Sequence, residues 1–323
     1  MIIRCDLCPK RCMIEPGQSG ECRIRVNLDG RLVAVTYGHP CTVHVDPIEK
    51  KPLFHFLPAT TSLSLATVGC NLHCKNCQNW EISQQNPEEV PASPLPPADI
   101  PKLAVEHGCR SVSYTYTDPV VYFEYTFDSS EYVRRAGLKN VMVTAGYINR
   151  EPLRELCRVV DAVRIDLKAL TDKFYQEICG ATLQPVLDSL VTARTLGVHV
   201  EVINLLIPTL NDSDREIGAL CRWIAENLGR EIPLHFSRFF PNYLMKNLPP
   251  TPAKSLIRAR EIARSAGLYY VYIGNLLVPD GENTFCPECG DLLVERRGYE
   301  VLKNILQNGR CPRCNREIYG VWL

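Results

Sequence analysis

The middle of the chain alternates between short apolar runs and segments with helical periodicity. The apolar runs are rich in β-branched and aromatic residues, whereas the segments between them repeat apolar residues every three or four positions. This alternation predicts parallel strands joined by right-handed crossover helices. The predicted strands are 62–69, 111–117, 140–146, 162–168, 198–207, 233–239 and 269–275, and the predicted helices include 100–108, 151–160, 213–229 and 251–267.

Six or seven such units favour an α/β fold, a (β/α) partial TIM-like barrel. A doubly wound open sheet is the competing prediction, but no glycine fingerprint follows the first strand. The expected organisation is an N-terminal cysteine-rich module (1–57), a barrel core (58–278) and a C-terminal zinc-ribbon-like module (279–323). Barrel chemistry lies on loops that leave the C-terminal ends of the strands.

Helix boundaries can also be read from the sequence. Ser213 and Thr251 are expected helix starts, and Gly229 and Gly267 are expected helix ends.

Composition narrows the classes of function. Among 323 residues, 46% are hydrophobic, and 36 basic residues balance 36 acidic ones. A neutral chain has no overall field that would favour nucleic acid or an anionic membrane, although a local basic patch leaves nucleic acid open. The N-terminus lacks the apolar stretch of a signal peptide, and no run approaches the ~20 apolar residues of a membrane span. We therefore expect a cytoplasmic protein.

The sixteen cysteines fall mostly into three groups, which in a large cytosolic chain indicates metal binding. Four lie in 5–22, three in 70–77 and four in 286–314. The other five stand alone and are expected to be small buried hydrophobic residues: Cys41, Cys109, Cys157, Cys179 and Cys221.

The central group lies in "ATVGCNLHCKNCQNW", residues 66–80, directly after the first predicted strand. Cys70, Cys74 and Cys77 give the spacing C-x3-C-x2-C. Three thiolates on a [4Fe–4S] cluster leave one iron open. An open iron can chelate S-adenosylmethionine (SAM), whose sulfonium an electron then cleaves to a 5′-deoxyadenosyl radical. The alternative is zinc, with His73 or a distant residue as fourth ligand.

Longer stretches carry a family resemblance. "VDPIEKKPLFHFLP", "ATVGCNLHCKNCQNWEISQ", "HFSRFFPNY" and the terminal "CPECG" resemble the AmmeMemoRadiSam system radical SAM enzymes. These are relatives of the pyruvate formate-lyase activating enzymes within the radical SAM superfamily. The resemblance implies a [4Fe–4S] cluster and SAM as cofactors, an electron donor such as ferredoxin or flavodoxin, and a Memo-family protein as partner.

The second predicted strand ends in "SYTYTDP", where the wider superfamily often has a Gly-Gly-Glu-Pro motif that holds the amino group of SAM. Thr115, Thr117 and Asp118 are candidates for that contact because their oxygens accept hydrogen bonds from an ammonium. Alternatively, Asp118 caps a helix that has Pro119 in its first turn.

Further candidates follow from later strands. "DAVRIDLK" places Arg164, Asp166 and Lys168 on one face of a strand and apolar residues on the other. The resemblance implies that Asp166 and Lys168 contact SAM, and the alternative is a buried ion pair. His235 either positions a cofactor or substrate or is a hydrogen-bonded core histidine.

The chain departs from the superfamily at one position. An aromatic residue often precedes the last cysteine of the loop and lies near the adenine, but this chain has Asn76, with Trp80 as a possible substitute.

The two outer cysteine sets predict further metal sites. Two CxxC pairs separated by 21 residues are close to zinc-ribbon spacing: Cys286, Cys289, Cys311 and Cys314. The N-terminal set is expected to bind zinc or an auxiliary iron–sulfur cluster, and sequence leaves both open: Cys5, Cys8, Cys12 and Cys22.

Three functions are consistent with these features. The favoured one is a radical SAM enzyme that abstracts hydrogen from an unknown substrate. A glycyl-radical-enzyme activase is a more specific version of the same chemistry. A non-catalytic zinc-binding adaptor protein would instead hold zinc at all three cysteine groups.

Overall fold

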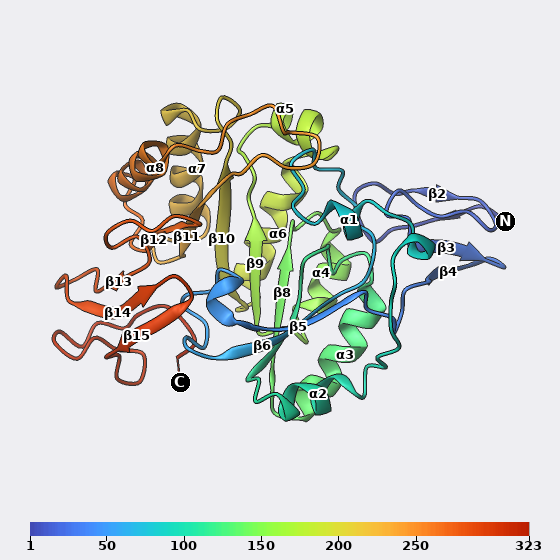
Figure 1. Ribbon diagram of the computed structural model, residues 1–323, viewed down its shortest axis with the longest axis horizontal. Helices are drawn as coiled ribbons and strands as arrows, with labels where there is room; N and C mark the ends of the chain where they lie inside the picture. Colours follow the sequence, from blue (N-terminus) through green and yellow to red (C-terminus); the bar gives the residue numbers. More distant parts are fainter. Residues whose placement is uncertain (323) are drawn as a thin grey trace.

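The computed structural model describes residues 1–322, and its centre is an eight-stranded sheet whose strands follow one another in chain order (Figure 1). Neighbouring strands from β6 to β12 are parallel, and β5 is antiparallel to β6. All seven predicted strands are present, which confirms the α/β fold. Because β5 and β12 are edge strands, the barrel is incomplete. The strands are β5 (Thr42–Pro47), β6 (Thr61–Ala66), β7 (Ser111–Tyr114), β8 (Lys139–Thr144), β9 (Ala162–Asp166), β10 (His199–Leu206), β11 (Leu234–Arg238) and β12 (Val271–Gly274).

Helices connect the parallel strands. The structure adds the long helices α3 and α6 and the short helices α1 and α5 to the four helices that periodicity indicated. Within the described residues the helices are α1 (Trp80–Ser83), α2 (Ile100–Glu106), α3 (Phe123–Arg135), α4 (Arg150–Leu156), α5 (Asp172–Phe174), α6 (Gln184–Thr195), α7 (Asp214–Asn227) and α8 (Ala253–Ser265), with a π-helical turn at Tyr175–Cys179 and short 3-10 turns at Ile48–Lys50 and Pro87–Glu89.

The expected helix boundaries have different outcomes. The Ser213 hydroxyl accepts from the backbone N–H of Glu216, so Ser213 caps α7 as predicted. Gly229 and Gly267 follow α7 and α8 with positive φ angles of 112° and 92°. The prediction for Thr251 is wrong, because α8 begins at Ala253. The Thr251 hydroxyl instead donates to the carbonyl of Leu206 at the end of β10 and accepts from the N–H of Phe239, just after β11.

Small strands flank the sheet on opposite sides of the molecule in Figure 1. β1 (Ile3–Arg4) pairs with β2 (Met13–Ile14), and β3 (Arg25–Leu28) pairs with β4 (Arg31–Ala34), near the N-terminus. The C-terminal sheet contains β13 (Thr284–Phe285), β14 (Leu292–Arg297) and β15 (Glu300–Asn304). β5 lies within the segment expected to precede the barrel, yet it is hydrogen-bonded into the main sheet. No helix in residues 1–322 is long and apolar enough to cross a membrane.

Side-chain alternation separates an apolar outer layer from a polar interior. Along β9, Val163 and Ile165 join the same core cluster as Leu153 of α4 and Leu190 of α6. Arg164 and Asp166 point the other way and line the interior cavity. The period-two pattern in "AVRID" therefore places one face of β9 against the helices and the other face in the cavity lining.

A buried carboxylate, that of Glu201, joins the barrel wall to residues 48–57, which we call the closing segment. This segment packs Ile48, Leu53 and Phe56 against β8 residues. Glu201 of β10 accepts four hydrogen bonds, from the backbone N–H groups of Phe54 (3.1 Å) and His55 (2.8 Å) and from Nε2 of His199 (3.0 Å) and His235 (2.7 Å). Although burial opposes ionisation, the two histidines hold the pKa of Glu201 well below its usual value.

We predict that Glu201→Ala lowers the free energy of unfolding by about 3–5 kcal/mol, because removing one partner of a buried charged network leaves the others unpaired. Urea denaturation followed by circular dichroism measures the change. Glu226→Ala, on the exposed face of α7, is the control and should stay within about 0.5 kcal/mol of wild type. Equal stability of the two variants would contradict a structural role for the network.

Candidate active site

A cavity of about 440 Å³ lies at the C-terminal ends of the parallel strands. Parallel strands end at the same edge, so residues from distant parts of the sequence meet there. The volume lies within the range of ligand pockets, about 300–1,000 Å³. Its wall includes Cys70, Cys74, Cys77, Thr115, Thr117, Asp118, Thr144, Asp166, Lys168, His235, Ser237 and Asn275.

The three central cysteines face this cavity from the loop that follows β6. Among the described residues, only the C-terminal cysteines form a group of three or more metal-ligating side chains whose ligand atoms all lie within 4.8 Å of one another. The sulfurs of Cys70, Cys74 and Cys77 are therefore more widely spread. A tetrahedral zinc would draw its thiolates together because each sulfur lies about 2.3 Å from the ion. A cube instead binds each thiolate at a different iron. The spread favours a cluster over a single ion.

Backbone contacts hold the cysteine loop on the π-helical turn. The N–H of His73 donates to the carbonyl of Cys179 (2.9 Å), and the N–H of Lys75 donates to that of Ile178 (2.9 Å). The His73 ring contacts Gln84 and Glu21 instead of a cysteine sulfur. His73 is therefore committed to hydrogen bonds outside the group of three sulfurs.

Cys179 lies near this loop, although nothing in the sequence pattern indicates it. Its thiol is close enough to Cys74 to lower the pKa of Cys74, whereas burial raises the pKa values of Cys70 and Cys77. Because Cys179 stands alone in the sequence, only the packing of the π-helical turn reveals this proximity.

The segment after β7 is fastened to the cysteine loop. The Thr117 hydroxyl donates to the carbonyl of Thr67 (2.8 Å), and Asn79 Nδ2 donates to the carbonyl of Tyr116 (2.7 Å). Thr115 is buried in the same wall. Thr115 and Thr117 therefore share the cavity lining with the three cysteines.

Asp118 is buried and binds the end of β8. Its carboxylate accepts from the N–H of Val120 (3.1 Å), the hydroxyl of Thr144 (2.8 Å) and the N–H of Ala145 (2.9 Å). Burial outweighs these bonds and raises the pKa of Asp118. The alternative role as a helix cap is wrong, because α3 begins only at Phe123 after Tyr122.

At the end of β9, one carboxylate lies between two cations. Asp166 forms ion pairs with Arg164 and with Lys168, the latter at 3.0 Å. Although burial opposes both shifts, the pairing lowers the pKa of Asp166 and, together with Cys74, raises that of Lys168. The structural ion pair exists, and the same three side chains line the cavity.

Of the remaining candidates, His235 and Asn76 line the cavity and Trp80 does not. His235 lines the cavity while its Nε2 donates to Glu201, so the hydrogen-bonded core histidine and the cavity residue are the same side chain. Asn76 also lines the cavity, and its Oδ1 is buried without a hydrogen-bond partner in the described chain. Trp80 is outside the lining and stacks on Tyr243, with ring centroids 5.1 Å apart.

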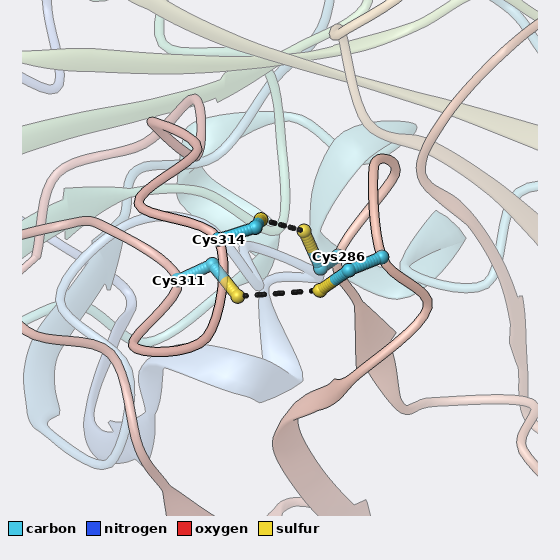
Figure 2. Close-up of side chains that lie close together, drawn as sticks. Cys286, Cys311 and Cys314 are labelled. Carbon is cyan, nitrogen blue, oxygen red and sulfur yellow. Dashed lines mark hydrogen bonds between the residues drawn. The ribbon is translucent and has the colours of Figure 1, made fainter.

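The C-terminal cysteines form a compact group of four (Figure 2). Cys286 lies 3.5 Å from Cys314, and Cys289 lies 3.6 Å from Cys311, measured between sulfurs. These separations suit one tetrahedral metal ion. The neighbouring hairpin reaches back to the barrel, because Tyr299, between β14 and β15, lines the cavity.

Known proteins show the same fold and sequence pattern. The radical SAM superfamily matches residues 64–221, which include the three-cysteine loop and strands β7 to β10. The chain belongs to the radical SAM superfamily. It is 46% identical to the uncharacterized protein MJ0808 of Methanocaldococcus jannaschii over 98% of this chain and 95% of that protein. This radical SAM enzyme therefore has a full-length relative, but one whose name gives no reaction.

Two named relatives are activating enzymes. The pyruvate formate-lyase-activating enzyme of Clostridium pasteurianum is 26% identical over 48% of this chain and 66% of its own length. The benzylsuccinate synthase activating enzyme of Thauera aromatica is 21% identical over 55% of this chain and 57% of its own length. This chain thus matches less than two thirds of each.

Solved structures agree on the fold. A radical SAM methyltransferase from Sphaerobacter thermophilus superposes with a TM-score of 0.53 at 16% identity, covering 68% of each chain. SuiB of Streptococcus suis, bound to its precursor peptide SuiA, gives 0.52 at 17% identity over 69% of this chain and 50% of that one.

The superfamily implies an iron–sulfur cluster and SAM, and the residues present fit both groups. Three spread thiolates face one cavity, and the buried Oδ1 of Asn76 has no partner in the described chain. An unpartnered buried oxygen is costly unless a ligand donates to it. The loop would hold the cluster, and the cavity beside it would hold SAM.

Gly69 provides a test of how the loop is placed. Its φ angle is +96°, and a Cβ there would lie 2.5 Å from the carbonyl oxygen of Cys22 and 2.7 Å from Cγ2 of Ile24. We predict that Gly69→Ala displaces the loop and reduces iron bound at the three cysteines by more than half. Iron and sulfide analysis after anaerobic purification measures the loss.

Gly108→Ala is the matched control, because Gly108 has a φ angle of +66° but a Cβ there would meet nothing within 4 Å. Both substitutions carry backbone strain of about 1–3 kcal/mol, so only the close contact differs. Equal iron contents in the two variants would show that the contact does not place the loop.

Proposed function

We propose that this enzyme reductively cleaves SAM at a [4Fe–4S] cluster held by Cys70, Cys74 and Cys77, and that the product radical removes a hydrogen atom from a substrate. The observation that supports this most is the placement of three spread thiolates in the lining of one cavity. A reduced cluster bound there would supply the single electron that splits SAM into methionine and a 5′-deoxyadenosyl radical.

The chain's own residues would bind and orient SAM. The Thr115 and Thr117 oxygens and Asp166 accept hydrogen bonds from an ammonium, and Lys168 donates to a carboxylate. Asp118 already accepts from three donors, so we assign it the role of holding β7 and β8 in register beside the loop. His235 adds a further polar side chain to the cavity lining.

The direct test uses spectroscopy and product analysis. Wild-type protein, reconstituted anaerobically and reduced, should show a [4Fe–4S] electron paramagnetic resonance signal that changes on adding SAM, and should form 5′-deoxyadenosine. Cys74→Ala should abolish both responses because the cluster loses one of only three thiolates. Zinc content should not change.

Cys157→Ala is the control for loss of a thiol, since Cys157 belongs to none of the three groups, and it should retain signal and product. A wild-type signal that is insensitive to SAM, or zinc loss in Cys74→Ala, would overturn the assignment.

A glycyl-radical activase is the second candidate, and the two activating-enzyme relatives favour it. Such an enzyme removes the hydrogen atom from a backbone glycine of a partner protein. Incubation with SAM, reductant and a glycyl-radical enzyme encoded in the same genome should produce an organic radical signal on the partner. Cleavage of SAM without that signal would exclude the tested partner and favour another substrate.

Other parts of the proposal concern partners. An electron donor such as ferredoxin or flavodoxin would reduce the cluster. The resemblance to AmmeMemoRadiSam system enzymes also makes a Memo-family protein a candidate partner. Zinc is our proposal for the C-terminal cysteines, as a structural ion that leaves no open position. Membership in the superfamily weighs against the non-catalytic adaptor.

A further inference from the structure

The N-terminal cysteines lie against the three-cysteine loop, inside the fold. Cys5, Cys8 and Cys22 are each less than a tenth exposed, and Cys12 is partly buried. Cys5 and Cys8 belong to the same core cluster as Leu72 and Cys74. The N-terminal cysteines are therefore buried in the part of the molecule that contains the three-cysteine loop.

Both residues that flank Cys70 contact this set. The backbone of Gly69 packs on the carbonyl of Cys22 so closely that a Cβ would lie 2.5 Å away. On the other side, the side chain of Asn71 lies beside Cys8 and donates to the carbonyl of Tyr147 (2.7 Å). The two cysteine groups are thus joined through single residues.

The spacing of the N-terminal sulfurs differs from that of the C-terminal group. The four C-terminal sulfurs lie within 4.8 Å of one another. Within residues 1–322, no three sulfurs of the N-terminal set lie that close together. The chain nevertheless brings these cysteines together: the N–H of Cys5 donates to the carbonyl of Cys12 (2.9 Å), and a Cβ on Gly20, two residues before Cys22, would lie 3.4 Å from the Cys12 sulfur. A zinc ion collects four thiolates at one atom, but a cube distributes them over four irons. This arrangement fits the cube.

A buried cation lies beside the set. Arg25, three residues after Cys22, is 7% exposed and forms two hydrogen bonds to Glu124 (2.7 and 2.9 Å). Its Nε is buried and has no partner in the described chain, and the same holds for Nη1 of Arg23. Buried donors without acceptors are costly. Sulfur atoms of a cluster accept hydrogen bonds, and such bonds tune its potential.

We propose that Cys5, Cys8, Cys12 and Cys22 hold a second [4Fe–4S] cluster, packed against the loop of the first. Four protein thiolates leave no open iron, so this centre would bind no SAM and would only exchange single electrons.

The first test leaves the N-terminal set intact. Cys70→Ala/Cys74→Ala/Cys77→Ala, purified and reconstituted anaerobically, should retain about four irons and about four sulfides per chain, together with an iron–sulfur signal that SAM does not change. Iron, sulfide and zinc analysis with electron paramagnetic resonance measures this. Zinc in place of iron, or no metal at the N-terminal set, would overturn the proposal.

The second test removes the N-terminal site from an otherwise unchanged chain. Cys8→Ala/Cys22→Ala should lose about half of the iron and keep the SAM-sensitive signal, whereas Cys157→Ala should lose none. Full iron content in the double variant would refute the second cluster. If the double variant does not fold, the triple variant decides.

The two assignments fail in different ways. Iron in the triple variant combined with a wild-type signal that ignores SAM would contradict the proposed function and leave the second cluster standing. The reverse pattern, a SAM-sensitive wild type and an iron-free triple variant, would remove only the second cluster.

Discussion

A thiolate binds only a metal atom within bonding distance of its sulfur, so sulfur spacing decides what kind of centre a cysteine group holds. This chain contains both arrangements. The C-terminal sulfurs converge, with pairs at 3.5 and 3.6 Å, while those of the other two groups remain apart. Eleven cysteines thus divide into sites of two kinds by geometry, although all three groups contain the same CxxC element. The metal centres proposed for this chain depend on that difference.

Charge is managed by pairing inside the barrel. Asp166 lies between Arg164 and Lys168, and Glu201 accepts from two histidines and two backbone N–H groups. An unpaired ion in this interior would cost several kcal/mol. Pairing lets the interior remain polar enough for a charged ligand such as SAM and still fold. The two networks have separate positions, since Asp166 is near the cysteines and Glu201 contacts the segment that closes the barrel.

Local patterns predicted the strands because alternation and β-branched residues are properties of the strand itself. They also placed the three cysteines, the segment after β7 and the face of β9 at one edge, because parallel strands share that edge. β5 was missed as part of the sheet, since only its pairing with β6 defines it. The bonds of Asp118 to Thr144 and Ala145, and the contact between Cys179 and Cys74, join residues far apart in sequence. No local signal carries such information.

The C-terminal hairpin adds one side chain to the barrel that it covers. Arg296 donates to the carbonyl of Phe54, and its guanidinium lies 4.5 Å from the Phe54 ring, which fixes the hairpin on the closing segment. Tyr299, three residues further on, stands in the cavity wall. The C-terminal hairpin lies outside the repeating β/α units, yet it forms part of the cavity wall. Divergence of this short turn offers a route to new substrates while the radical-generating half of the enzyme stays the same.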